Sequence, residues 1–426
     1  MLDTNEQLRR LRKRIARIDA KYSDARQARR QVHAWPRMPS ARCLIEQWSE
    51  GSVIANEFGE HFQTERSFPG HRQHGSADIG ALAELPGTLL NALGEREIDV
   101  PVDRWAFLDT ETTGLLGDPG TYAFLIGVGR VTADGFRVRQ FFLREYAEEH
   151  SALAALEAHL ADFDVLVTYN GKSYDQPLLE TRFQIRRHGH PFSRLTHVDL
   201  LHGARRLWKM RLENCRLIQL EQEILGFWRE GDLPGELIPY VYFEYLRSHE
   251  AQRLVPIFHH NAMDILTLAC LTAIVPAAFQ GTDAESLSRL GIRRGEDLAS
   301  IARWLLTAAQ HEQALDLFKR AVRTTLPDKL LFRTLWDIAL LEKKLDRSAA
   351  ALEIFMDLAA CRNEYRAGAL EELAKHHEHE TRDFASALRF TTEALSLGES
   401  PALHRRRERL EKRLESRAKA KPLRRT

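Results

Sequence analysis

The sequence predicts an α/β domain with a mixed sheet and flanking helices, followed by an all-α domain of helical repeats. Two observations support this prediction. Across residues 99–280, short β-branched and aromatic stretches alternate with helical stretches. Across residues 285–400 the pattern is helical throughout, and one helix-pair motif recurs. A chain of 426 residues is long enough for two or three domains with a sizeable core.

Three consecutive strands open the α/β domain. The first begins at Trp105 and ends at a turn at Gly114, and the next two cover residues 122–131 and 136–143. Asp134-Gly135 is a typical hairpin turn between the second and the third strand. The pattern therefore predicts an antiparallel meander.

A helix and a parallel strand are predicted after the meander. The helix covers residues 151–163, and the β-branched strand covers residues 164–169. A second helix over 176–188 and a short strand over 197–200 follow. Meander, helix and parallel strand is the order expected of a ribonuclease H-like core.

Three further segments are expected outside these domains: a basic helix over residues 1–35, an irregular extension over 36–98 and a basic tail over 401–426. Residues 9–30 hold ten Lys and Arg against two Asp, and residues 405–425 hold eleven against three Glu. Such ends suit phosphate backbones, although solvated tails share this composition. The net charge of the whole chain is only +1, so the protein is not a polycation.

The helical domain contains an internal repeat of helix pairs. Alanines recur at corresponding positions of the pairs, with spacings of 35 to 37 residues. The first helices carry Ala302, Ala339 and Ala374, and the second helices carry Ala314, Ala351 and Ala387. This period resembles a tetratricopeptide-like array, which could bind a protein or a peptide. Chance alignment of amphipathic helices is the alternative explanation.

Cysteine usage and hydropathy predict a cytoplasmic protein that does not contact a membrane. The four cysteines are scattered with no CxxC pair, which argues for a reducing compartment and against a zinc site. The N-terminus is charged and lacks an apolar signal segment. No apolar run approaches the roughly 18 residues that a membrane span needs.

Two carboxylates at the end of the first strand are the first candidates for a functional site. Asp109 and Glu111 are two residues apart, so their side chains share a face of the strand, about 7 Å apart along the chain. Carboxylates this close repel one another unless a cation lies between them. Such oxygen ligands suit Mg²⁺ or Mn²⁺. The alternative is a strand that ends in solvated acids.

Three later segments extend the acidic pair into a candidate site. Asp175 precedes a helix, where it could also serve as the N-cap. His260 and Asp264 are four residues apart and share a helix face, while His259 is five residues from Asp264. Asp264 lies beside apolar residues, where a carboxylate is costly unless a positive charge pairs with it. Asp199 is expected to be structural, holding a loop or an arginine.

The order of these motifs resembles a known superfamily. Asp-x-Glu, then Asn-x-x-x-Tyr-Asp, then His-x-x-x-(x)-Asp resembles the three exonuclease motifs of the DEDD, or DnaQ-like, superfamily. The segments Phe107–Leu115, Tyr169–Asp175, Leu225–Gly235 and His260–Asp264 look like the YprB-type ribonuclease H-like family. The resemblance covers about residues 100–275, and some family members also carry helical repeats.

The resemblance implies a two-metal hydrolase of phosphodiesters with Mg²⁺ or Mn²⁺. Asp109, Glu111 and Asp264 would ligate the first ion. Asp109 would bridge to the second ion, which Asp175 would hold through water. Two such ions stabilise both the attacking and the leaving oxygen.

The resemblance also implies a histidine that deprotonates the attacking water. One branch of the superfamily points to His259 and another to the position of His260. Spacing leaves both residues open, and the helix face shared with Asp264 slightly favours His260.

Four residues near the motifs are candidates for contacts with substrate: Thr110, Asn170, Lys172 and Tyr174. Tyr174 could stack on a terminal base, or it could pack against the next helix. Lys172 could contact a phosphate, or it could be a solvated loop lysine. Arg229 and Asp232 could contact substrate or each other.

The function predicted from the sequence is a metal-dependent nuclease, expected to be a 3′–5′ exonuclease on DNA or RNA. Two alternatives stay open. The protein could be a scaffold that binds nucleic acid and, through the repeats, a protein or peptide. It could also be a structure-specific endonuclease on the same core.

Overall fold

A computed structural model describes residues 45–93, 97–114, 120–186 and 189–420. The expected basic helix over residues 1–35 and the last six residues of the expected basic tail lie outside these ranges. The chain divides into two compact units. The first contains residues up to 86, 100–199 and 221–270, and the second contains residues 87–99, 200–220 and 271–426.

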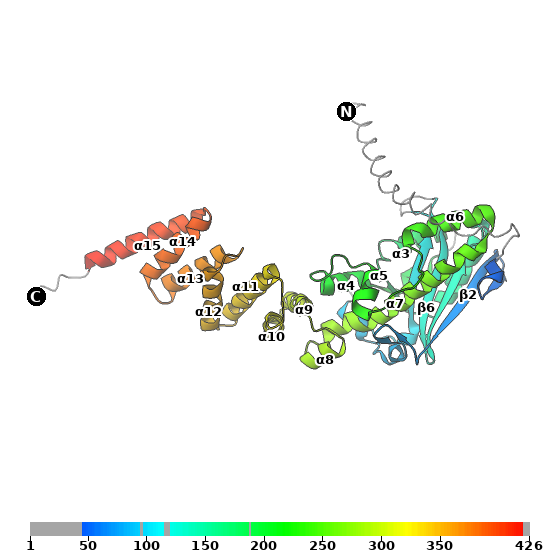
Figure 1. The fold of residues 1–426 in the computed structure, drawn as a ribbon, viewed down its shortest axis with the longest axis horizontal. Coiled ribbons are helices and arrows are strands. Elements are labelled where there is room, and N and C mark those ends of the chain that lie inside the picture. Colours follow the sequence, from blue (N-terminus) through cyan, green and yellow to red (C-terminus); the bar gives the residue numbers. More distant parts are fainter. Residues whose placement is uncertain (1–44, 94–96, 115–119, 187–188, 421–426) are drawn as a thin grey trace, which may run out of the picture. The chain divides into compact units, whose positions relative to one another are not determined.

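The first unit is built on a seven-stranded mixed sheet, with strand order β1-β2-β7-β6-β5-β8-β9 (Figure 1). Strand β5 pairs antiparallel with β6 and parallel with β8, so the predicted meander and parallel strand are confirmed. The strands are β1 (Ser52–Asn56), β2 (Gly59–Pro69), β5 (Trp105–Thr112), β6 (Ala123–Thr132), β7 (Gly135–Phe142), β8 (Val165–Thr168) and β9 (Thr196–Asp199).

Strands β1 and β2 correct the expectation of an irregular extension over residues 36–98. Strand β2 is antiparallel to β7 from Phe62 to Pro69, and β1 pairs with β2. The small hairpin of β3 (Gln73–His74) and β4 (Ala77–Asp78) follows. Strand β2 was not predicted, because the buried and exposed residues of this strand do not alternate regularly. Its stability comes from a long ladder of hydrogen bonds to β7, which local periodicity does not report.

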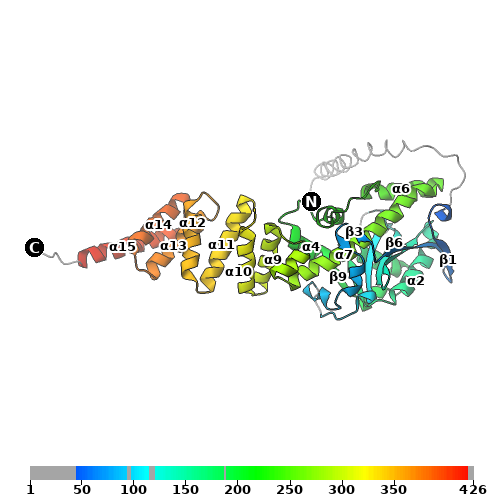
Figure 2. The same ribbon diagram turned by 60° about the horizontal axis from the view of Figure 1, so that its bottom comes forward.

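Helices α2 (Glu149–Leu160) and α7 (Val255–Gln280) lie on opposite faces of the sheet (Figure 2). On β2, Glu65 binds Arg139, whose guanidinium also contacts His159 of α2. The next residue, Arg66, instead contacts His259 of α7. Successive side chains of a strand point to opposite faces, so the two helices must cover different sides.

Helix α2 confirms the predicted apolar face. Its leucines Leu153, Leu156 and Leu160 are all buried. Helix α3 (Asp175–Ile185) follows β8. Helix α6 (Ile238–Ser248) packs against β6, where Tyr242 stacks on Phe124 with ring centroids 3.9 Å apart.

The core helix α7 corrects the expectation that no apolar run is long enough for a membrane span. Within the described ranges, the stretch Ala251–Gln280 has the length and composition needed to cross a membrane. However, 78% of its most apolar window is buried inside the fold. Burial of this kind is typical of the central helix of a folded domain.

The second unit consists largely of helices that pack in sequence order, α9 on α10, α11 on α12 and α13 on α14. The six alanines of the repeat, including Ala302 and Ala314, are all buried. Residues 401–420 of the expected tail form α15, with Leu403 and Leu410 buried. The helices are α9 (Gly295–Thr307), α10 (His311–Val322), α11 (Asp328–Lys344), α12 (Ser348–Ala360), α13 (Arg366–His379), α14 (Phe384–Leu397) and α15 (Pro401–Ala420).

Candidate active site

Asp109 and Glu111 lie half-buried at the carboxyl end of β5. Asn261 of α7 holds the first of them, because its Nδ2 donates to Asp109 Oδ2 over 2.9 Å. Asn261 is fully buried, and Gln140 of β7 donates to its Oδ1 over 2.8 Å. This hydrogen-bond chain fixes the orientation of the Asp109 carboxylate.

Asp175 reaches the same site from the first turn of α3. Its Oδ1 accepts a hydrogen bond from Thr110 Oγ1 over 2.5 Å, and its side chain is buried. The N-cap of α3 is Tyr174, whose side chain makes no capping hydrogen bond, and Asp175 is the first residue of the helix rather than the N-cap that the sequence left possible. Thr110 therefore links β5 to α3, which brings the first and second motifs together.

The loop after β8 is held in place by Asp199, as predicted. The Asp199 carboxylate accepts hydrogen bonds from the backbone N–H groups of Asn170 and Lys172, over 2.8 and 3.1 Å. Asn170 has a φ of 66°, in the left-handed region that asparagine tolerates better than most residues. Two backbone donors on one carboxylate offset the cost of that conformation.

A cavity of about 230 Å³ lies between β5, this loop and α3. Tyr174, at its edge, is 50% exposed rather than packed on the following helix. Three of the four predicted substrate residues line the cavity, and the exposed Lys172 lies in the same loop. The lining residues are Asp109, Thr110, Thr112, Gly114, Tyr169, Asn170, Tyr174, Asp175 and Leu178.

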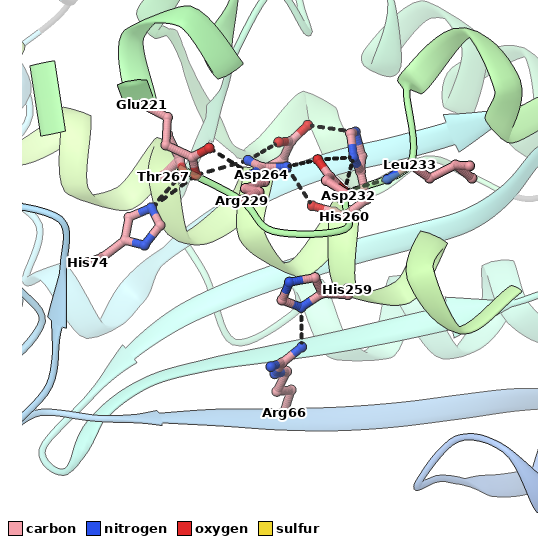
Figure 3. Close-up of polar contacts among 10 residues, drawn as sticks. All are labelled: Arg66, His74, Glu221, Arg229, Asp232, Leu233, His259, His260, Asp264 and Thr267. Carbon is pink, nitrogen blue, oxygen red and sulfur yellow. Dashed lines mark hydrogen bonds and ion pairs between the residues drawn. The ribbon is translucent and has the colours of Figure 1, made fainter. Parts of the chain in front are cut away.

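The two neighbouring histidines of α7 point to different partners (Figure 3). His260 Nδ1 donates to the carboxylate of Asp232 over 2.9 Å, and His260 Nε2 lies 3.6 Å from Asp264 Oδ2. His259 Nδ1 instead accepts a hydrogen bond from Arg66 over 2.8 Å. The structure therefore brings His260 beside Asp264 and turns His259 toward β2.

Arg229 is a buried cation within the candidate site (Figure 3). Its side chain is only 1% exposed and donates to Asp264 Oδ1 over 2.5 Å. It also donates to both carboxylate oxygens of Glu221, over 2.7 and 3.0 Å, and lies 3.3 Å from Asp232. Arg229 and Asp232 thus contact each other, one of the two outcomes that the sequence left open.

Burial and neighbouring carboxylates raise the pKa of Asp109 and of Glu111. Burial raises the pKa of Asp109 well above its ordinary value, and the charges of Asp264 and Asp175 add to this shift. Burial likewise raises the pKa of Glu111, together with the charges of Asp109, Asp264 and Asp175. Burial is the main cause that raises the pKa of Asp175 to about 6. Asp109 and Glu111 therefore lie within the electrostatic influence of acids on α3 and α7, and such a cluster favours a bound cation.

The donor set fits a divalent metal in its chemistry, because carboxylate oxygens are the ligands that Mg²⁺ and Mn²⁺ prefer. Among the residues that the structure describes, no three His, Cys, Asp or Glu side chains are already arranged around a common metal position. Three of the carboxylates accept hydrogen bonds from protein groups instead, Asp109 from Asn261, Asp175 from Thr110 and Asp264 from Arg229.

Four residues of this site were not predicted from the sequence as catalytic or metal-binding residues: Asn261, Arg229, Glu221 and Asp232. The only local sequence signal for Asn261 was its position next to His260. Arg229 and Asp232 come from a loop rich in Pro and Gly, whose constrained conformation was visible in the sequence but whose target was not. Glu221 carries no sequence signal, because its partners are distant along the chain.

Comparison with known proteins identifies the class to which this fold and site belong. Residues 106–275 match the RNase_H superfamily, through the family RNase_H_2. The chain is also 35% identical over 295 residues to the uncharacterized protein YprB of Bacillus subtilis (strain 168), an alignment that covers 68% of each chain. The chain therefore belongs to the YprB family of the ribonuclease H superfamily.

Membership of this superfamily indicates a nuclease-type activity and a nucleic-acid substrate. Nucleases with this fold usually use divalent metals, which is consistent with the carboxylates at the end of β5.

Proposed function

We propose that this protein is a metal-dependent nuclease of the DEDD type that removes nucleotides from the 3′ end of DNA or RNA. The observation that carries the proposal is the electrostatic cluster of Asp109, Glu111, Asp175 and Asp264, in which neighbouring charges contribute to the raised pKa of Asp109 and Glu111. In the proposed site, Asp109, Glu111 and Asp264 would hold one Mg²⁺ or Mn²⁺, and Asp109 and Asp175 would hold a second ion. The ions would supply charge stabilisation for the attacking and leaving oxygens.

The protein's own residues orient the reaction. Asn261 fixes the Asp109 carboxylate. The proton of neutral His260 lies on Nδ1, which donates a hydrogen bond to Asp232. The lone pair on Nε2 would then take a proton from water on the Asp264 side. Tyr174 is exposed beside the cavity and would stack on the terminal base.

Cleavage by the full-length protein with Mg²⁺ or Mn²⁺ tests this proposal, on single-stranded and duplex DNA and RNA. Asp109→Asn removes a charge at the centre of the cluster with little change in shape. It should lower the rate at least about 100-fold, the scale seen when one transition-state stabilising group is lost. Asp103→Asn, at an exposed position before β5, is the matched control and should keep the wild-type rate. Equal rates for wild type and Asp109→Asn would overturn the proposal.

A second candidate function rests on the helical unit, which we propose to be a tetratricopeptide-like array that binds a protein or peptide. The observation that favours it is a cavity of about 440 Å³ among α11, α12, α13 and α15, lined by apolar residues such as Phe355 and by charged residues of both signs, such as Lys375 and Glu372. In a protein that served only as a binding scaffold, Mn²⁺ would not raise the melting temperature. A clear rise would instead support the metal-dependent enzyme.

A further inference from the structure

The candidate site contains a cation of its own. Arg229 comes from a loop in which Gly226 and Gly231 both adopt a φ of 68°, a conformation that favours glycine. This loop inserts the Arg229 side chain among acids, where it is almost completely buried. A guanidinium stays charged under all physiological conditions, so the position carries a permanent positive charge.

Glu221 anchors this cation. It is fully buried in a π-helical turn (Glu221–Leu225) and binds Arg229 with both carboxylate oxygens. His74 of β3 and Thr267 of α7 also contact Glu221. Burial would raise the pKa of Glu221, but the hydrogen bonds from His74 and Arg229 outweigh burial and lower it. Glu221 therefore stays ionised and offsets the cost of burying Arg229.

The Arg229 nitrogen that binds Asp264 is Nη2, which also binds Glu221, whereas Nη1 contacts Asp232 and the backbone oxygen of His260 (Figure 3). Arg229 Nη2 lies 2.5 Å from Asp264 Oδ1, a short charge-assisted hydrogen bond. Asp264 is also one of the carboxylates proposed to hold a divalent ion. A metal ion bound to Asp264 would lie close to the guanidinium, and the two would repel each other because both carry positive charge.

We propose that Arg229 is the resident counter-ion of Asp264 and a positioning residue that sets the metal affinity of the site. A divalent cation would engage Asp264 only when Arg229 releases this carboxylate, while Glu221 keeps the guanidinium anchored nearby. This inference rests on the proposed function, because it takes Asp264 as a metal ligand. The two proposed metal positions then differ in their affinity for the ion, and the position that uses Asp264 binds it more weakly.

Calorimetric titration of the full-length protein with Mn²⁺ alone tests this inference. Removing Arg229 by itself would leave Glu221 as an unpaired buried charge and could unfold the protein. The variant Arg229→Met/Glu221→Gln removes both charges and keeps the volume. The weaker of its two proposed sites should bind Mn²⁺ on the order of 10- to 100-fold more tightly than the same site in the wild type. Residues that contact metal ligands change metal affinity on this scale. Mn²⁺ should also raise the melting temperature of the variant more than that of the wild type.

The matched control is Arg182→Met/Glu149→Gln, which removes another buried bidentate ion pair from the same unit. Its Mn²⁺ affinity should equal that of the wild type. Adding Asp264→Asn to both the wild type and the Arg229→Met/Glu221→Gln variant should remove the difference between them.

Two results would count against the inference, and they are distinguishable. Mn²⁺ affinity in Arg229→Met/Glu221→Gln that is equal to or weaker than in the wild type overturns the role of Arg229 and leaves the proposed function intact. Absence of Mn²⁺ binding by both proteins overturns the proposed metal-dependent function, and the role of Arg229 fails with it.

Discussion

At the scale of single residues, the neighbours of His259 and His260 shift the pKa values of these two adjacent histidines in opposite directions. Burial disfavours the charged form of His260, but the hydrogen bond to Asp232 and the charge of Asp264 outweigh it and raise its pKa. Burial lowers the pKa of His259, and the charge of Arg66 lowers it further. His259 Nδ1 also accepts a hydrogen bond from Arg66. His260 is therefore the better candidate for the base.

Alanine substitution should separate the two histidines. We expect His260→Ala to lower the single-turnover cleavage rate by about 100-fold or more, because a general base contributes roughly 10²–10⁴. His259→Ala should cost less than about tenfold, since it removes only a contact with Arg66. Equal losses, or a greater loss from His259→Ala, would reverse the assignment.

At the scale of elements, the close packing of α7 on β6 positions the site. A Cβ at Gly127 of β6 would overlap with Asn261 and Ile265 of α7. The missing side chain therefore lets α7 approach the sheet closely enough for Asn261 to reach Asp109 across β6. The motif on α7 meets the motif on β5 because of this glycine.

Gly127→Ala should push α7 away from the sheet. We expect the free energy of unfolding to fall by about 1–3 kcal/mol, the usual cost of overpacking, and the cleavage rate to fall as well. Urea denaturation and the cleavage assay measure the two effects. Gly189→Ala is the control, because a Cβ there would contact nothing within 4 Å. Wild-type stability and rate in Gly127→Ala would refute this account of the packing.

The sequence predicts the elements whose pattern is local. Strands β5 to β8 and helix α2 follow from alternation, β-branched runs and an apolar face. Strand β2 was missed because its stability comes from pairing with β7 rather than from its own pattern. Motif order predicted the acids and left His259 and His260 open, whereas Glu221 was not predicted and Arg229 was expected only to contact substrate or Asp232. The role of Glu221 and Arg229 depends on contacts between residues 8 to 147 positions apart.

At the scale of the whole molecule, buried histidines should limit stability in acid. Burial lowers the pKa of His159 to about 4, and the charges of Arg139 and Arg130 act in the same direction. Burial also lowers the pKa of His197 to about 4. The unfolded chain then binds protons more readily than the folded one between about pH 6.5 and 4, so stability is lost as pH falls through this range.

His159→Phe should weaken this pH dependence. The ring lies among Phe141 and Phe163, so phenylalanine fits the site without a titrating group. The wild type should lose up to about 3 kcal/mol more than the variant between pH 7 and 4, given the shift in the pKa of His159. Urea denaturation at a series of pH values measures the difference. Parallel pH curves for the two proteins would show that His159 does not carry this effect.

The most direct test of the proposed activity is a time course of cleavage with Mn²⁺ on one single-stranded oligonucleotide, labelled either at its 5′ end or at its 3′ end. We predict a ladder of products shortened one nucleotide at a time with the 5′ label, and immediate release of a labelled mononucleotide with the 3′ label. Asp109→Asn should give neither product. Discrete internal cuts with both labels, or an intact substrate with the wild type, would contradict a 3′–5′ exonuclease.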